Sequence, residues 1–171
     1  MKVLIVDDDA VSRYILQEIL QTLGYEVTTC KDGSEAWDKY LEVHFRLVIS
    51  DWMMPKVDGL ELCRRIRELN RTDYSYFILQ TSQHEKEELL AGLEFGADNY
   101  LLKPFDSNDL KIRLKIANRV LALQTNVQAL QNTVSNCSVC AEEHAATSTH
   151  CHFDALPMES ATKSSFLTKK P

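Results

Sequence analysis

The chain has 171 residues, of which 44% are apolar, and it carries a net charge of −6. This length suits one domain with an appendage, the apolar fraction is enough for a sizeable core, and the negative charge argues against direct binding of nucleic acid. The apolar run after Lys2 is too short for a signal peptide or a membrane span, and no later run is long enough to span a membrane. These features predict a cytoplasmic protein whose five cysteines stay reduced.

Apolar runs and helical spacings alternate along the chain from its first residues. Strands are predicted at residues 2–6, 26–30, 47–50, 76–80 and 99–102. Helices are predicted at residues 10–23, 34–43, 58–69 and 84–95, and from about residue 106 onward. Such alternation with short loops predicts an α/β fold with a parallel sheet and helices on both faces. The expected architecture is a flavodoxin-like, doubly wound sheet of five strands in the order 2-1-3-4-5, followed by an extended C-terminal helix.

Carboxylates follow two strands that this order makes neighbours. Asp7 and Asp8 follow the first strand and Asp51 ends the third, so the three should lie within a few ångströms of one another. Carboxylates packed together repel, and a hard cation such as Mg²⁺ would relieve the repulsion. Singly, an aspartate after a strand is usually a turn cap. The cluster as a whole favours a metal-dependent phosphate site.

Other polar residues are expected at the same edge of the sheet. Thr81 and Ser82 follow the fourth strand, and Lys103 follows the fifth. A threonine after a strand is usually a turn residue, and a lysine is usually solvated. A hydroxyl and an ammonium beside three carboxylates are nevertheless the groups that phosphoryl chemistry uses.

Four motifs make the chain resemble the response-regulator receiver domain of two-component signalling, over about residues 1–120. They are VDDD at 6–9, SDWMMPKVDG at 50–59, QTS at 80–82 and NYLLKPF at 99–105. The resemblance implies a receiver domain at residues 1–119 that accepts a phosphoryl group from a sensor histidine kinase or a phosphotransfer protein. It implies no enzymatic activity beyond the domain's own phosphorylation and slow dephosphorylation.

The resemblance also implies a role for each matching residue. Asp51 would be the phosphoacceptor, and Asp7, Asp8, Asp51 and the backbone carbonyl of Met53 would hold Mg²⁺. Thr81, Ser82 and Lys103 would face the phosphoryl group, Tyr100 would be the aromatic switch, and the Lys103–Pro104 peptide bond would be cis. Phosphorylation would then change the face formed by the fourth helix, fifth strand and fifth helix.

Two other functions fit the same fold less well. A flavodoxin-like FMN binder needs a phosphate loop rich in hydroxyl groups and glycine after the first strand, whereas this chain has DDDAVS, which repels phosphate. A hydrolase with an aspartyl nucleophile typically has a second aspartate two residues later, where this chain has Met53.

The last predicted helix continues past the receiver as a heptad stripe. Its members are Ile116, Val120, Leu123, Val127, Leu130, Val134 and Cys137. Valine at a and leucine at d favour a parallel two-stranded coiled coil, so residues 120–137 predict a homodimer. The alternative is a helix that folds back on its own receiver. Similar extensions link receivers to output domains, so the chain could also be the receiver part of a larger output enzyme, such as a diguanylate cyclase or a phosphatase regulator.

Residues 138–171 are rich in Ser, Thr, Ala and His and are expected to be disordered. Soft metal ligands gather where this tail begins. They are Cys137, Cys140, His144, His150, Cys151 and His152. This set is compatible with Zn²⁺, although its spacing matches no named finger.

Overall fold

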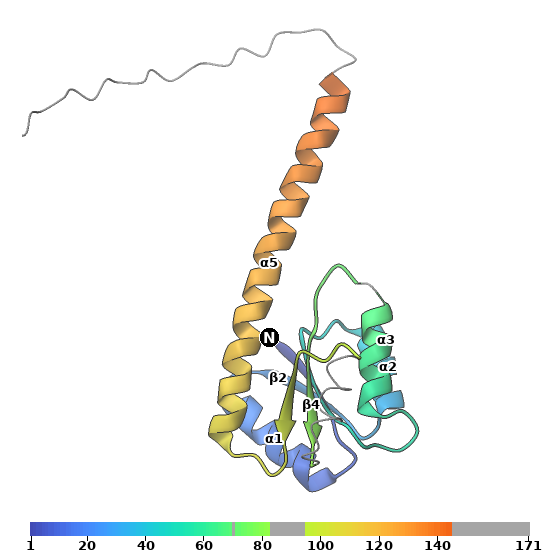
Figure 1. The fold of residues 1–171 in the computed structure, drawn as a ribbon, viewed down its shortest axis with the longest axis vertical. Coiled ribbons are helices and arrows are strands. Elements are labelled where there is room, and N and C mark those ends of the chain that lie inside the picture. Colours follow the sequence, from blue (N-terminus) through green and yellow to red (C-terminus); the bar gives the residue numbers. More distant parts are fainter. Residues whose placement is uncertain (70, 83–94, 145–171) are drawn as a thin grey trace, which may run out of the picture. The chain divides into compact units, whose positions relative to one another are not determined.

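The computed structural model describes residues 1–69, 71–82 and 95–144, and for residues 134–144 it describes the backbone alone. Five parallel strands form one sheet in the order β2-β1-β3-β4-β5, which confirms the predicted fold (Figure 1). The strands are β1 (Lys2–Val6), β2 (Glu26–Cys30), β3 (Leu47–Asp51), β4 (Tyr76–Thr81) and β5 (Asn99–Leu102). The order in which strands are added to the sheet reverses at β1, so the carboxyl ends of β1 and β3 lie side by side.

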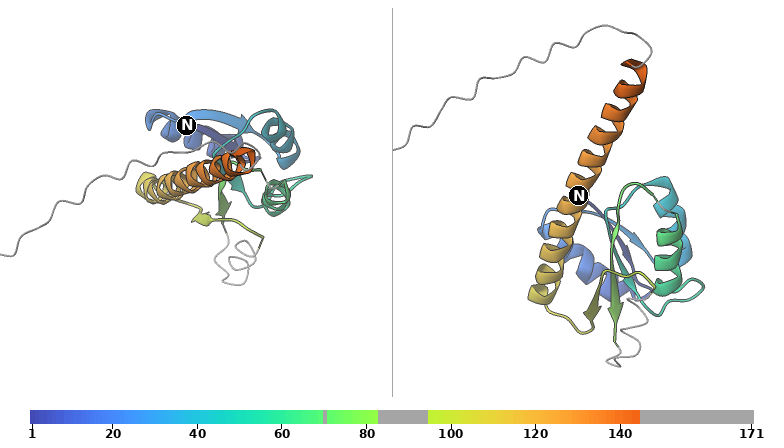
Figure 2. Two further views of the ribbon diagram at one scale, coloured as in Figure 1. Left: turned by 90° about the horizontal axis from the view of Figure 1, so that it is seen from above. Right: turned by 45° about the horizontal axis from the view of Figure 1, so that its top comes forward.

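Helices cover both faces of this sheet (Figure 2). They are α1 (Ala10–Thr22), α2 (Gly33–Glu42), α3 (Gly59–Glu68) and α5 (Ser107–His144). Side chains of α1 and α5 pack on one face of the sheet, and those of α2 and α3 pack on the other. The helix predicted at 84–95 lies outside the described residues, apart from Phe95, which is in a turn.

Three aspartates begin helices rather than joining the acidic site. The Asp9 carboxylate accepts hydrogen bonds from the backbone N–H groups of Val11 and Ser12 at the start of α1. Asp32 and Asp58 do the same for α2 and α3. Such caps satisfy N–H groups that have no partner within the helix. Asp9 is therefore a structural residue, although it directly follows Asp7 and Asp8.

The strands at the centre of the sheet are nearly continuous apolar runs because both of their faces are covered. Every residue of β4 is buried, and so are the first four residues of β3 and the last four of β1. This packing holds the ends of β1, β3 and β4 in fixed relative positions. Side chains that follow these strands therefore emerge from a rigid base.

Gly59 fixes the start of α3 against the end of β3. Its backbone N–H donates to the carbonyl of Trp52 at 2.9 Å. A Cβ atom at this position would lie 2.2 Å from the carbonyl oxygen of Asp51 and 2.9 Å from a methyl carbon of Leu79. The close approach excludes any side chain and sets the path of the loop after Asp51.

Helix α5 continues to His144, past Cys137, where the sequence placed the end of the helical extension. Residues Met1–Thr133 form one compact unit, and Val134–Pro171 are assigned to a second. Among the described helices, none combines the length and apolar character needed to cross a bilayer.

We expect Gly59→Ala to lower the free energy of unfolding by about 1–3 kcal/mol, because the new methyl group must displace backbone at the end of β3. Gly24→Asn is the matched control, since Gly24 has a φ of +83° that asparagine tolerates and no atom near its Cβ position. Urea denaturation of both variants measures the difference. Equal stabilities would contradict the close packing at Gly59.

Candidate functional site

The carboxylates of Asp7, Asp8 and Asp51 meet at the carboxyl end of the sheet. One oxygen atom from each lies within 4.8 Å of the others. Asp7 is completely buried, Asp51 is partly exposed and Asp8 is exposed. The predicted cluster is therefore present, with one acid beneath the surface and one open to solvent.

Three donors satisfy the buried carboxylate of Asp7. Its Oδ1 accepts from the backbone N–H of Asp9 at 2.9 Å. Its Oδ2 accepts from the Ser12 hydroxyl at 2.7 Å and from the Lys103 ammonium at 2.8 Å. The role of Ser12 was not predicted from the sequence. The available signal was its place in the first turn of α1, close to the strand ends.

Asp51 is held by one donor on each oxygen atom. The Trp52 backbone N–H donates to Oδ1 at 2.8 Å, and the Lys103 ammonium donates to Oδ2 at 2.9 Å. Burial raises the pKa of Asp51 above its ordinary value, Lys103 opposes this increase, and the nearby Asp7 adds to it. The carboxylate is thus poorly solvated, and a second cation at this site would stabilise its charged form.

Lys103 carries the opposite charge between these two acids. Burial lowers the pKa of its ammonium, but hydrogen bonds to Asp7 and Asp51 outweigh burial, and the net effect is a raised pKa. The pKa values of Lys103 and Asp51 both rise because the ammonium has two acidic partners, whereas Asp51 shares its one cation with another carboxylate. The site therefore has an unbalanced negative charge.

These residues fit a hard divalent cation. Such ions take carboxylate and carbonyl oxygen atoms, and Mg²⁺ usually keeps several water ligands. Asp7 is fully buried and accepts three hydrogen bonds, whereas Asp51 is partly exposed and Asp8 is exposed, so Asp8 and Asp51 offer the more open carboxylates. Met53 follows in the loop after β3, and its exposed side chain lies 69% open to solvent. The role of its carbonyl stays a prediction.

The remaining predicted residues surround this cluster. Thr81 ends β4 and is buried, and its carbonyl accepts the backbone N–H of Lys103 at 2.7 Å. Ser82 is exposed. The Lys103–Pro104 peptide bond is cis, as predicted. Tyr100 lies on β5 with the guanidinium of Arg113 5.6 Å from its ring centroid, a contact with α5 that the sequence did not reveal.

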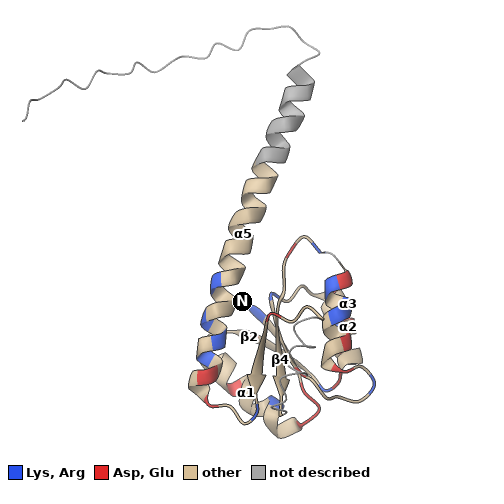
Figure 3. Ribbon diagram, in the orientation of Figure 1, with Lys and Arg blue, Asp and Glu red and all other residues tan. Residues whose placement is uncertain are grey.

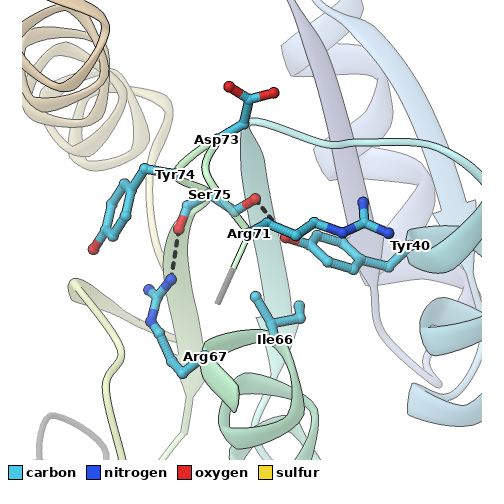
Figure 4. Close-up of a pocket in the computed structure, with 7 residues that line it drawn as sticks. All are labelled: Tyr40, Ile66, Arg67, Arg71, Asp73, Tyr74 and Ser75. Atoms are coloured by element: carbon cyan, nitrogen blue, oxygen red, sulfur yellow. Dashed lines mark hydrogen bonds between the residues drawn. The ribbon is translucent and has the colours of Figure 1, made fainter. Parts of the chain in front are cut away.

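A cavity of about 170 Å³ lies at the opposite end of the sheet, before β4 (Figure 4). Arg67 reaches it from α3 and donates to the carbonyls of Gly96 and Ser75 and to the carboxylate of Asp98. The Tyr40 hydroxyl and the Ser75 hydroxyl are hydrogen-bonded at 2.7 Å. These groups are committed to joining α2 and α3 to the sheet, so we assign this cavity a structural role.

The side chains of the predicted tail ligands all lie outside the described part of the structure. Cys137, Cys140 and His144 belong to the backbone of α5, and their side chains are not described. His150, Cys151 and His152 lie outside the described residues. The Zn²⁺ site stays a prediction.

Comparison with known proteins gives the family. A family profile described as "Response regulator receiver domain" matches residues 3–115. Chemotaxis protein CheY1 of Helicobacter pylori (strain J99) is 37% identical over 118 residues, which are 68% of this chain and 95% of that protein. The chain therefore belongs to the response regulator receiver domain family.

Solved structures agree with this assignment. Chemotaxis protein CheY4 of Vibrio cholerae superposes with a TM-score of 0.64 at 34% identity, covering 68% of this chain and 97% of that one. Transcriptional regulatory protein ResD of Bacillus subtilis is 38% identical over 114 residues, 67% of this chain but 46% of that protein. The chain thus spans about half the length of the transcriptional regulators it matches.

We expect Lys103→Met to lower the free energy of unfolding by about 3 kcal/mol, because the buried Asp7 would lose its cation. Lys39→Met, which removes the exposed pair with Glu42, should leave stability unchanged within error. Chemical denaturation at pH 7 without divalent cations measures both. Equal effects would show that the Lys103 ion pairs contribute no more than a surface pair.

Proposed function

We propose that this chain is a response regulator that accepts a phosphoryl group on the carboxylate of Asp51. The observation that supports it is the Asp51 carboxylate itself, which is bound by Lys103 and lies beside Asp7 and Asp8 at the end of β3. The donor would be a phosphohistidine of a sensor histidine kinase or a phosphotransfer protein. The proposed compartment is the cytoplasm, where such proteins act, and the net charge of −6 supports a partner other than nucleic acid.

The reaction is nucleophilic substitution at phosphorus. A carboxylate oxygen of Asp51 forms a bond to phosphorus while the bond between phosphorus and the histidine nitrogen breaks, and the electron pair leaves with the imidazole. The Trp52 N–H orients one oxygen of the nucleophile. The Lys103 ammonium is placed to stabilise charge on the transferring phosphoryl oxygens. Hydrolysis of the acyl phosphate by water would reset the site slowly.

Mg²⁺ is the proposed cofactor, held by Asp8 and Asp51 with the Met53 carbonyl, and by Asp7 directly or through water. When bound, it would neutralise charge on the transferring group and lessen the repulsion between carboxylates. The 4.8 Å grouping of their oxygen atoms supports this proposal. Asp7 also keeps Lys103 in place through its own ion pair.

The proposed donor surface lies on α1 next to the site. Val11, Tyr14 and Ile15 are large apolar side chains that are 65%, 62% and 49% exposed. They follow directly after the acidic loop, so a helical partner that contacts them could present a phosphohistidine to Asp51. Apolar surface next to a reactive group is typical of a transient docking site.

Phosphorylation would change the conformation of side chains at and next to β5. The Thr81 hydroxyl would move to bind the phosphoryl group, and the Tyr100 ring would leave Arg113 and turn into the vacated space. Such a change shifts the population between two packings of one fold. The face formed by β5 and α5 would transmit the signal, and the helix predicted at residues 84–95, which was expected to be part of this face, lies outside the described residues.

A second candidate is the receiver part of a larger output protein. A solved two-component response regulator/GGDEF domain protein superposes with a TM-score of 0.67 at 27% identity, covering 71% of this chain and 50% of that one. The uninterrupted helix α5 would suit a connection to an output domain. Both candidates use the same phosphorylation site.

The stripe on α5 supports homodimerisation. Ile116, Leu123, Val127 and Leu130 are between 41% and 67% exposed, although all are apolar. The residues of α5 that are buried against the receiver are Leu110, Leu114, Ala117 and Leu121, and Val120 of the stripe packs partly against the same cluster. At about 100° per residue, the two sets are centred roughly a third of a turn apart. The receiver therefore leaves Ile116, Leu123, Val127 and Leu130 uncovered, while it partly covers Val120.

A second copy of the chain is the occupant we propose for this stripe. No charged residue occurs in the sequence between Arg119 and Glu142, and Figure 3 shows the described part of this stretch of α5 without Lys, Arg, Asp or Glu. The stretch therefore lacks the charged flanks of an isolated surface helix. A parallel partner would cover valine with valine and leucine with leucine. Arg46 donates to the carbonyl of Leu121 and to the hydroxyl of Thr125, and neither residue belongs to the stripe. Each receiver would therefore stay attached to its own helix on a side away from the partner helix.

We expect acetyl phosphate and Mg²⁺ to place one hydroxylamine-sensitive phosphoryl group on Asp51, because acyl phosphates react with hydroxylamine. Asp51→Asn should abolish labelling, and Asp8→Asn should raise the Mg²⁺ concentration that is needed. Radiolabelling and intact mass measure both effects. Stoichiometric labelling of the Asp51→Asn protein would identify a different nucleophile.

We expect the double variant Leu123→Asp/Leu130→Asp to be monomeric and the wild type dimeric, because charges in the seam would lose hydration without a partner. Ala122→Asp/Ala129→Asp is the matched control, since these exposed residues lie on the same turns but outside the stripe. Sedimentation velocity measures all three, with and without phosphodonor. A monomeric wild type at high concentration would overturn the dimer, while Asp51 labelling would be unaffected.

A further inference from the structure

Gln80 has a polar side chain in a fully buried place. It is 0% exposed, and neither its carboxamide oxygen nor its nitrogen has a hydrogen-bond partner among the described residues. In the described part of the chain, two other side chains have such unpaired buried atoms, those of His44 and Arg113, and both residues are partly exposed. Buried polar groups are nearly always paired, so this amide requires an explanation.

The sheet places Gln80 directly beside the phosphoacceptor. Gln80 is the register partner of Asp51 on β3 and of Leu101 on β5. Partners in a parallel sheet project to the same face, and neighbouring strands lie about 4.8 Å apart. The carboxamide of Gln80 and the carboxylate of Asp51 are therefore neighbours on one face of the sheet. The backbone reinforces this, since the Gln80 carbonyl accepts the Trp52 N–H at 2.9 Å.

The Lys103 side chain must cross the carboxyl end of β4 to make its ion pairs. Lys103 follows β5, and its backbone N–H donates to the Thr81 carbonyl, which extends the pairing of β4 and β5. Its ammonium nevertheless reaches Asp51 on β3. Because β4 lies between β3 and β5, the lysine side chain crosses β4 on the face that Gln80 occupies.

The ammonium also has a donor to spare. An ammonium has three N–H groups, and hydrogen bonds to Asp7 and Asp51 use two of them. A carboxamide oxygen is a suitable acceptor for the third. The structure thus has an unpaired acceptor on β4 and an ammonium N–H without an acidic partner on the side chain that crosses β4.

We propose that Gln80 is a positioning residue for Lys103 during phosphoryl transfer. This inference rests on the proposed phosphorylation of Asp51. As the Asp51 carboxylate becomes an acyl phosphate, the ammonium turns from Oδ2 toward the phosphoryl oxygens. Gln80 Oε1 accepts the third ammonium N–H and holds Lys103 at the angle that the transferring group requires. The unpaired amide of the resting protein gains its partner in that step.

Gln80→Met tests this role, because methionine has nearly the same shape but no amide. Ile78→Met is the matched control, since Ile78 is also fully buried and lies two residues earlier on the same face of β4. Thermal melts, Mg²⁺ affinity from tryptophan fluorescence, and the rate of phosphorylation across acetyl phosphate concentrations are measured for each. Gln80→Leu provides a second apolar variant.

We expect Gln80→Met to melt at a higher temperature, because an unpaired buried amide is removed. Its maximal phosphorylation rate should nevertheless fall about tenfold, the usual worth of a hydrogen bond to a charged group. Mg²⁺ affinity should not change, and Ile78→Met should keep the wild-type rate. A purely structural residue would change the melting temperature without this loss of rate.

Two results would overturn the inference while the proposed function stands. One is a more stable Gln80→Met protein with the wild-type maximal rate, which would reduce Gln80 to an amide that binds a buried water. The other is a loss of rate that follows a loss of Mg²⁺ affinity, which would place the effect at the metal site. A wild-type protein that takes no phosphoryl group would instead end the proposed function and this inference together.

Discussion

The ion pair between Lys103 and the buried carboxylate of Asp7 is the interaction on which the site depends. A carboxylate without exposure to solvent is costly unless charge and hydrogen bonds compensate for it. Lys103, Ser12 and the Asp9 N–H supply that compensation from three parts of the chain. The same ammonium bonds Asp51, so the structural requirement of one acid determines the position of the cation beside the other.

The ion pairs of Lys103 stabilise the site, but electrostatic repulsion between its three carboxylates remains. Three acids and one ammonium leave negative charge in a partly buried place, and burial raises the pKa of Asp51. A cation and a phosphoryl group would both change this balance, which is how the proposed phosphorylation at one strand end would alter a face of the domain. The apolar strands below are packed on both sides and would change less.

Helix α5 joins this site to a surface outside it. Its first turns pack on the sheet through Leu110, Leu114 and Ala117, and Arg113 contacts the ring of Tyr100. The exposed stripe begins on the same helix at Ile116. A helix is stiff over this distance, so a change at Tyr100 and a partner on the stripe would be mechanically connected. One face of the helix thus anchors it to the receiver, and another carries the proposed dimer contact.

The sequence by itself determined the fold, because strand and helix periodicities alternate and short right-handed connections allow few arrangements. It also determined the acidic cluster, since Asp7, Asp8 and Asp51 follow strands whose ends the strand order makes neighbours. Tertiary structure alone decided how these acids are satisfied. The contact of Arg113 with Tyr100 joins two elements that periodicity does not pair, and the burial of the Gln80 amide without a partner among the described residues follows from packing on both faces of the sheet. Only Ser12, five residues after Asp7, left a local signal. Likewise, periodicity showed an apolar stripe on α5, but only the packed domain showed that the receiver covers a different face of that helix.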